Sequence, residues 1–196
     1  ANLMIDLGTN AEMVVGNKDR LLCTSAAAGP AFEGGNLSCG MPAISGAIYD
    51  LMIRPDSGAG KAELAAAINT GQMTGYTKQN GFLIAYKTVE NAPPRGICGS
   101  GIIAAVSELL TNDLLDETGI LDDEQFEDGV PLAEGADGPI LLTQGDIRGM
   151  QMAKANIRAG IDTLLDAYGV SCKDVEELYL ADSFEHNMNI PKAAVL

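Results

Sequence analysis

Three short segments of this 196-residue sequence have residues that could contact an anion or a metal ion, and two of them combine these residues with glycine. In the first, Asp6-x-Gly8-Thr9-Asn10, an acidic residue closes a short apolar run. Gly8 would let the backbone approach a phosphate closely, while Thr9 and Asn10 would add hydrogen-bond donors. Asp6 could hold a hydrated Mg²⁺ against the phosphate oxygens, which makes it the candidate catalytic and metal-binding residue. An ordinary hairpin turn of the same composition is the alternative.

The second segment, Gly96-x-x-Gly99-Ser100-Gly101, directly precedes an apolar pattern with helical spacing. Backbone N–H groups at the start of a helix, together with the positive end of its dipole, favour an anion. The lysine of a P-loop is missing, so the segment is not a Walker motif. Tight packing of the helix against a sheet would need the same glycines, and Ser100 is the expected N-cap.

The third segment, Asp182-Ser183, follows the apolar run of residues 175–181. Ligands of open α/β sheets lie beyond the carboxyl ends of the strands, so these two side chains are candidate ligand contacts. Helix capping uses the same residue types and is the alternative. We interpret the single histidine, His186, as a surface or capping residue rather than as a general base.

The charge of the chain excludes some partners. It has 27 acidic and 12 basic residues and a formal net charge of −15, so nucleic acids and anionic membranes would be repelled. Acidic residues are concentrated in residues 113–128, which we interpret as a solvated loop. The sequence has neither an apolar run of about 18 residues nor a signal-peptide pattern, and a cytoplasmic location is expected.

Four cysteines occur in the sequence, and none shares a C-x-x-C spacing with another. With one histidine available, we expect no cysteine- or histidine-ligated metal or iron–sulfur site within this chain, and we interpret the cysteines as buried free thiols of a reducing compartment. The chain opens inside an apparent strand without an initiator methionine and stops in a plausible helix. We therefore expect it to be a fragment of a longer protein.

Hydrophobic spacing predicts three short N-terminal strands joined by tight turns, which is typical of an antiparallel meander. The predicted strands lie at residues 3–7, 11–16, 20–24, 46–53, 81–89, 139–143 and 175–181, and the predicted helices at 61–68, 102–110, 143–169 and from Pro191. Residues 25–46 are rich in glycine and are expected to form a loop with one helical turn. Thr143 and Asp146 have capping-box spacing at the start of the longest helix, which Gly169 ends. An α/β fold with a mixed sheet flanked by helices is therefore expected.

The order of these segments resembles the actin-like ATPase (ASKHA) superfamily, whose domains have a ribonuclease H-like fold, and in particular the C-terminal domain of the reductive activators of corrinoid proteins. The matching segments are residues 3–12, 27–34, 96–103, 142–147 and 151–161. They span nearly the whole chain. The resemblance identifies residues 1–196 with the second subdomain only, with a variable insertion roughly at residues 55–92. The first subdomain would lie upstream of Ala1.

The resemblance implies that the domain binds ATP and Mg²⁺ and that Asp6–Asn10 meets the phosphates and the metal. The other residues that it implies in nucleotide binding are Glu33, Gly34, Gly99, Ser100, Gly101, Asp182 and Ser183. Full-length members resemble a [2Fe–2S] ferredoxin-type domain followed by a linker, a middle region and this domain. They use ATP to drive the reduction of cob(II)amide to cob(I)amide on a partner corrinoid protein of a methyltransferase system, and a homodimer is compatible with this organisation.

Family members have a glycine pair where this chain has Asp182 and Ser183, so side chains replace the flat surface on which a nucleoside would rest. Nucleotide affinity is then lower, or the adenosine is held differently. One alternative function is therefore a non-hydrolysing docking module for a corrinoid protein. Another is a different actin-like ATPase or kinase, such as an acyl-CoA dehydratase activator. The fragment alone is expected to hydrolyse ATP poorly, since the cleft needs both halves to exclude water.

Overall fold

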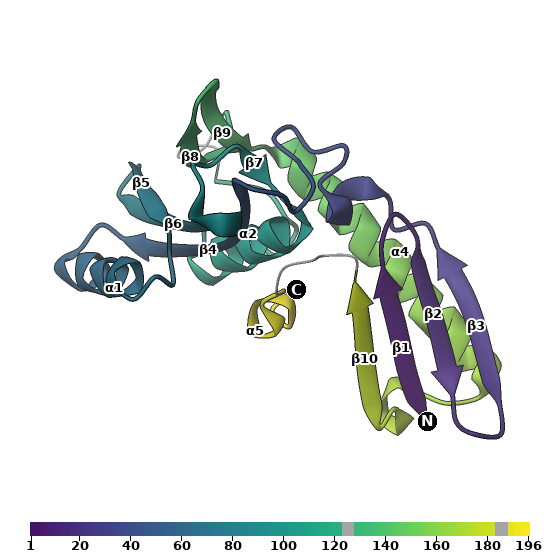
Figure 1. Ribbon diagram of the computed structural model, residues 1–196. Helices are drawn as coiled ribbons and strands as arrows, with labels where there is room; N and C mark the ends of the chain where they lie inside the picture. The colour runs from purple at the N-terminus through teal and green to yellow at the C-terminus, as the bar shows by residue number, and fades with distance from the viewer. Residues whose placement is uncertain (123–127, 183–187) are drawn as a thin grey trace.

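The computed structural model describes residues 1–122, 128–182 and 188–196 and consists of two lobes that share one long helix, α4 (Gln144–Tyr168) (Figure 1). One lobe contains a four-stranded sheet that lies against α4. The other contains a second four-stranded sheet, a two-stranded hairpin and the helices α1 and α2. The predicted α/β class is therefore confirmed.

The predicted antiparallel meander forms most of the first sheet. Its strands are β1 (Asn2–Leu7), β2 (Ala11–Gly16) and β3 (Leu21–Ala26), and β10 (Glu177–Asp182) pairs with β1 in parallel. The strand order is β10-β1-β2-β3, which makes the sheet mixed, as expected. In β1 every second side chain is buried in the core that contains α4, and the side chains between them lie on the opposite face.

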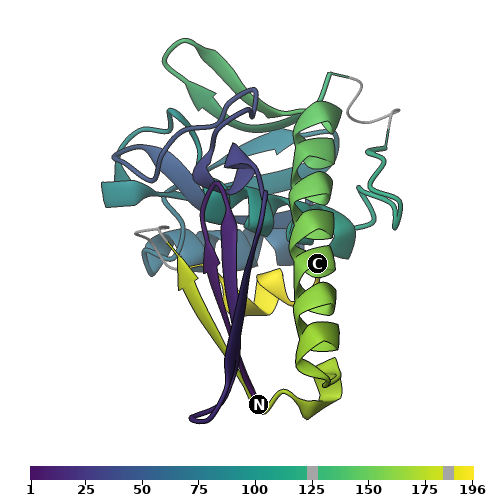
Figure 2. The same cartoon turned by 90° about the vertical axis from the view of Figure 1, so that its right-hand side faces the viewer.

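Helix α4 runs along the first sheet and continues to the second lobe (Figure 2). It begins with the predicted capping box, in which Thr143 and Asp146 each accept a hydrogen bond from the backbone N–H of the other. It ends at Gly169, whose φ of 88° is left-handed, as predicted. At Gly160 a Cβ would lie 2.5 Å from Cε of Met13, so glycine allows a close approach to β2. Neither α4 nor any other helix in the described ranges is long and apolar enough to span a membrane.

The second lobe is built from the chain between β3 and α4. Its elements are β4 (Ala47–Pro55), α1 (Gly58–Asn69), β5 (Gly75–Gln79), β6 (Phe82–Thr88), β7 (Gly96–Ile97), α2 (Gly99–Thr111), β8 (Val130–Gly135) and β9 (Gly138–Leu142). The sheet order is β5-β6-β4-β7, and α2 packs on β4. A short helix, α5 (Ile190–Ala193), packs against α2. Residues 55–92 supply α1, β5 and β6, and their variability stays a prediction.

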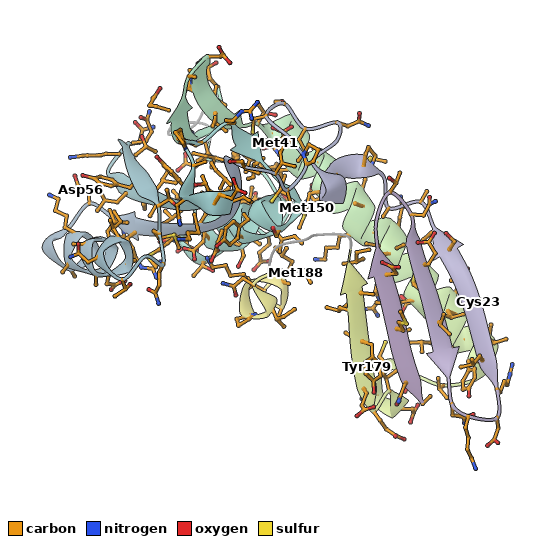
Figure 3. The ribbon with its side chains drawn as sticks, in the orientation of Figure 1. Cys23, Met41, Asp56, Met150, Tyr179 and Met188 are labelled. Atoms are coloured by element: carbon orange, nitrogen blue, oxygen red, sulfur yellow. The ribbon has the colours of Figure 1, made fainter. Side chains whose placement is uncertain are left out.

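One hydrophobic core extends through both lobes. It joins Ile5 of β1 to Ile53 of β4 and Ile102 of α2. Met150 of α4 is 2% exposed and lies where the two lobes meet (Figure 3). Because protein interiors are close-packed, this continuous core fixes the first sheet relative to the second lobe. The loops at the junction are therefore held on a rigid base.

Part of the second lobe is not predicted by the sequence. Strand β5 is mostly polar, β7 has 2 residues, and β8 contains a proline and a glycine, so hydrophobic periodicity gives no strand signal. The predicted N-cap of α2 is wrong. Cys98 is the N-cap, because Ser100 already lies in the first helical turn, where it is 1% exposed.

The cysteines and the acidic segment also differ from expectation. Of the four free cysteines, Cys98 is buried, Cys39 is half-buried, and Cys23 and Cys172 are exposed. In the described part of the acidic segment, residues 113–122, three leucines enter the core instead of being solvated. These are Leu114, Leu115 and Leu121.

Candidate functional site

The segment Asp6–Asn10 contains the turn between β1 and β2, at the end of the first sheet nearest the second lobe (Figure 1). The Gly8 N–H donates to the Asn10 carbonyl at 2.9 Å, which closes the turn. Thr9 and Asn10 are exposed. The segment is thus a hairpin turn whose tip is exposed. A hairpin turn and a phosphate-binding loop, the two interpretations of this motif, are therefore compatible.

Two carboxylates and a hydroxyl form a row on the exposed face of the sheet beside this turn. In the strand register Asp6 pairs with Glu12, and Glu12 pairs with Ser25. The Ser25 hydroxyl donates to the Glu12 carboxylate at 3.4 Å. In the described ranges no lysine or arginine forms an ion pair with Asp6 or Glu12. Oxygen ligands of this kind fit Mg²⁺, which usually takes one or two carboxylates and completes its shell with phosphate oxygens and water.

The end of β10 lies beside the same turn. Because β10 and β1 are parallel, their carboxyl ends meet at one edge of the sheet, and Asp182 pairs with Leu7, directly before Gly8. The backbone thus brings the first and the third candidate segments together. Ser183 and His186 lie outside the described residues, as does the side chain of Asp182.

The loop that contains Glu33 and Gly34 reaches the turn from the other side. The Gly29 N–H donates to the Thr9 carbonyl at 2.8 Å, and the 3₁₀ turn η1 (Pro30–Glu33) follows. Gly34 ends η1 with φ 77°, and a Cβ there would lie 2.2 Å from the Met41 carbonyl oxygen. A side chain at this position would therefore force the loop apart.

The segment Gly99–Gly101 has a different environment. It is buried in the second lobe, and a Cβ on Gly101 would lie 2.2 Å from the Ile48 carbonyl oxygen of β4. The Ser100 hydroxyl lies 3.3 Å from the buried Cys98 thiol. The contacts of this segment are those of a helix packed tightly on a sheet. A role in shaping the nucleotide side of the cleft stays a prediction.

Sequence reasoning missed two contacts that α4 makes with the loop after β3. The Asn156 side chain donates to the Ala27 carbonyl at 2.8 Å, and the Asp146 carboxylate accepts from the Ser38 N–H at 2.7 Å. The capping-box spacing reveals Asp146 but not its bond to Ser38. Neither contact has a local sequence signal, because the partners are 129 and 108 residues apart.

A largely buried ionic network anchors α5 to the second lobe, and it was not predicted either. The Lys192 Nζ lies 2.7 Å from Asp50 Oδ1 and 3.1 Å from Glu108 Oε1. Glu108 also accepts from the Arg54 guanidinium at 3.2 Å and from the Ile53 N–H at 2.9 Å. The network holds the chain that follows β10 against β4 and α2.

The pKa values of Cys39 and Asp56 in the second lobe differ from their ordinary values. Burial raises the pKa of Cys39 to about 12, and the negative charge of Asp146 adds to this effect. The Cys39 thiol is therefore neutral at physiological pH and is not an activated nucleophile. Hydrogen bonds from Lys78 and then Lys61 hold the pKa of Asp56 below its ordinary value. Asp56 lies next to α1, far from the β1–β2 turn (Figure 3).

Comparison with known proteins identifies the family. Residues 1–196 match the family described as "C-terminal domain of RACo the ASKHA domain". The chain belongs to this family. Both the predicted family and the predicted actin-like fold are thereby confirmed.

The similar proteins are much longer than this chain. The corrinoid activation enzyme RamQ of Eubacterium limosum is 31% identical over 211 residues, which cover 97% of this chain and 31% of RamQ. The Co(II) methylated amine-specific corrinoid protein reductase of Methanosarcina barkeri is 32% identical over 186 residues, 92% of this chain and 31% of that protein. A solved structure described as a reductive activator for corrinoid, iron-sulfur protein matches with a TM-score of 0.80 at 31% identity, over 100% of this chain and 30% of that one. The chain thus spans less than a third of the length of these relatives.

Proposed function

We propose that this chain forms part of the nucleotide-binding half of an ATP-dependent reductive activator, which returns the cob(II)amide of a corrinoid methyl-transfer protein to cob(I)amide. The observation that carries the proposal is the meeting of Asp6–Asn10, the end of β10 and the loop 29–34 at one edge of the first sheet. Membership of the ASKHA family supports ATP as the ligand. The printed names of the relatives, an activation enzyme and a corrinoid protein reductase, support the reaction.

In this proposal the β1–β2 turn receives the phosphates of ATP. Thr9 and Asn10 present backbone and side-chain donors at the exposed tip, and Asp6, with Glu12, holds Mg²⁺. When bound, the metal ion neutralises phosphate charge and clamps the phosphate oxygens. Without a cation the two carboxylates would repel a phosphate in a chain whose net charge is already −15. Nucleotide binding should therefore depend strongly on Mg²⁺.

The remaining features of the proposal concern the full-length protein. We infer that its partner is a corrinoid protein and that a [2Fe–2S] cluster in another part of the protein supplies the electron. ATP hydrolysis would require both halves of the cleft, since positioning and exclusion of water depend on both. A cytoplasmic location and a homodimer stay predictions.

A second candidate function is a docking module that binds the corrinoid partner without hydrolysing ATP. The observation that favours it is the pair Asp182 and Ser183, which stands where the family has glycines. Side chains at this edge would crowd a nucleoside. The two candidates differ in whether Mg·ATP binds at all.

Isothermal titration of the full-length protein with ATP, with and without Mg²⁺, tests the proposal. We expect binding that requires Mg²⁺ and that Asp6→Asn weakens by about tenfold or more, which corresponds to roughly 1.4 kcal/mol. Asp19→Asn is the matched control, because Asp19 is an exposed carboxylate in the turn at the opposite end of the same sheet. ATP binding that is equally tight without Mg²⁺ would contradict the assigned site. An equal loss of ATP affinity in Asp6→Asn and Asp19→Asn would contradict it as well. No binding by the wild type would favour the docking module.

A further inference from the structure

The loop after β3 is held on α4 at two points, and the turn of the candidate site is attached between them. At one end the Asn156 side chain donates to the Ala27 carbonyl at 2.8 Å. At the other end the Ser38 N–H donates to the Asp146 carboxylate at 2.7 Å. The two side chains lie nearly three turns apart on one helix, about 15 Å at the helical rise. Segment 27–38 is thus fixed along α4, which is itself fixed by the shared core.

Gly29 connects this segment to the site. Its N–H donates to the Thr9 carbonyl at 2.8 Å, and its φ of 78° is left-handed, a conformation that glycine adopts without strain. The Thr9 carbonyl lies at the tip of the turn between β1 and β2. The position of the tip therefore depends on a bond to a segment that is anchored elsewhere.

Asp146 does more than cap its helix. It is 3% exposed, and its carboxylate accepts from the Thr143 N–H at 2.7 Å, from the Thr143 hydroxyl at 2.8 Å and from the Ser38 N–H at 2.7 Å. The bond from the Thr143 N–H belongs to the capping box, whereas the bond from the Ser38 N–H is not needed to start a helix. Burying a carboxylate is costly unless its oxygens accept several hydrogen bonds, so this arrangement holds the loop firmly.

We propose that Asn156 and Asp146 are positioning residues of the nucleotide site. They hold segment 27–38 on α4, so that the Gly29 amide keeps the Thr9 carbonyl, and with it the β1–β2 turn, in the conformation that receives phosphate. The inference rests on the proposed function, because it assumes that this turn is the phosphate site. A turn that is already ordered pays less conformational entropy when the ligand binds.

Asn156→Ala in the full-length protein tests the inference, and Asn112→Ala is its matched control. The Asn112 side chain also donates to a backbone carbonyl at 2.8 Å, that of Glu108 at the end of α2 in the second lobe. Each variant loses one bond of the same kind. We expect Asn156→Ala to raise the Kd for Mg·ATP by about five- to tenfold, the equivalent of one hydrogen bond. We expect faster hydrogen exchange of the Gly29 amide in the same variant, and neither effect in Asn112→Ala.

Asp146→Asn serves as a second variant, with Asp174→Asn as its control. Asp174 forms a capping box with Ser171 but makes no bond to the segment. The Kd for Mg·ATP should rise in Asp146→Asn and not in Asp174→Asn. Equal Kd values in each pair, or unchanged Gly29 exchange in Asn156→Ala, would overturn the inference. If the wild type binds no Mg·ATP, the proposed function fails, and the exchange of Gly29 then decides whether α4 positions the turn.

Discussion

Replacing Lys192 by methionine should destabilise the protein more than the loss of a surface cation does. The Lys192 side chain is 17% exposed, and its carboxylate partners Asp50 and Glu108 are 23% and 10% exposed. Without Lys192, Asp50 loses its cation, and Glu108 keeps Arg54. Exposed ion pairs contribute about 0–1 kcal/mol, whereas breaking a buried pair costs about 3–5 kcal/mol. Because this network is mostly but not fully buried, we expect the free energy of unfolding to fall by about 2–3 kcal/mol.

Urea unfolding followed by circular dichroism measures this loss, and Arg158→Met is the matched control. Arg158 pairs with Asp162 one helical turn away, with side chains that are 67% and 48% exposed, so its loss should leave the free energy of unfolding nearly unchanged. Asp50→Asn should cost less in the Lys192→Met background than in the wild type, because its partner is already gone. An equal loss of unfolding free energy in Lys192→Met and Arg158→Met would refute the conclusion that the ionic network anchors α5.

Three further predictions concern single residues. The neutral thiol of Cys39 should react with iodoacetamide at neutral pH more slowly than the exposed Cys23, as mass spectrometry of the alkylated peptides would show, and equal rates would contradict the raised pKa. The lowered pKa of Asp56 contributes stability that is present above its ordinary value of 3.8 and is lost as the pH falls through the lower folded value. Protection of the β5–β6 amides against hydrogen exchange should therefore fall only below the ordinary value of 3.8. A loss of this protection between pH 5 and 7 would contradict the lowered pKa of Asp56. Gly101→Ala should lower the free energy of unfolding, measured by urea denaturation, by about 1–3 kcal/mol, because its Cβ would meet a backbone oxygen at 2.2 Å. Gly149→Ala in α4 is the control, because a Cβ at this position would have no neighbour within 4 Å, and it should stabilise the helix by about 0.5–1 kcal/mol. If both variants destabilised the protein equally, the packing described for Gly101 would be contradicted.

The parts of the fold that the sequence predicts are those with strong local signals. The β1–β3 meander follows from alternating apolar residues and short turns, and α4 follows from its capping box and from Gly169. Strands β5 and β7 have no such signal, because pairing with β6 and β4 stabilises them more than their own composition does. Leu115 and Leu121 were assigned to a solvated loop because their acidic neighbours dominate the composition of that segment.

The parts of the candidate site that the sequence predicts also have local signals. The turn Asp6–Asn10 and the end of β10 are each visible locally, and the parallel register that joins them follows from the fold class. Glycines that serve packing look the same in sequence as glycines that serve an anion, so the sequence leaves both interpretations of Gly101 open, and its role in nucleotide binding stays a prediction. The contacts of Asn156 and Asp146 connect residues more than 100 positions apart, so only the tertiary structure shows them.

The central claim is that ATP at the β1–β2 turn drives the reduction of a corrinoid protein. The most direct measurement is the absorbance change from cob(II)amide to cob(I)amide, with the full-length protein, an electron donor for its cluster and a purified corrinoid partner. We predict reduction that requires both ATP and Mg²⁺, that Asp6→Asn suppresses and that Asp19→Asn leaves unchanged. Reduction that proceeds without ATP, or equally well in Asp6→Asn, would contradict the claim.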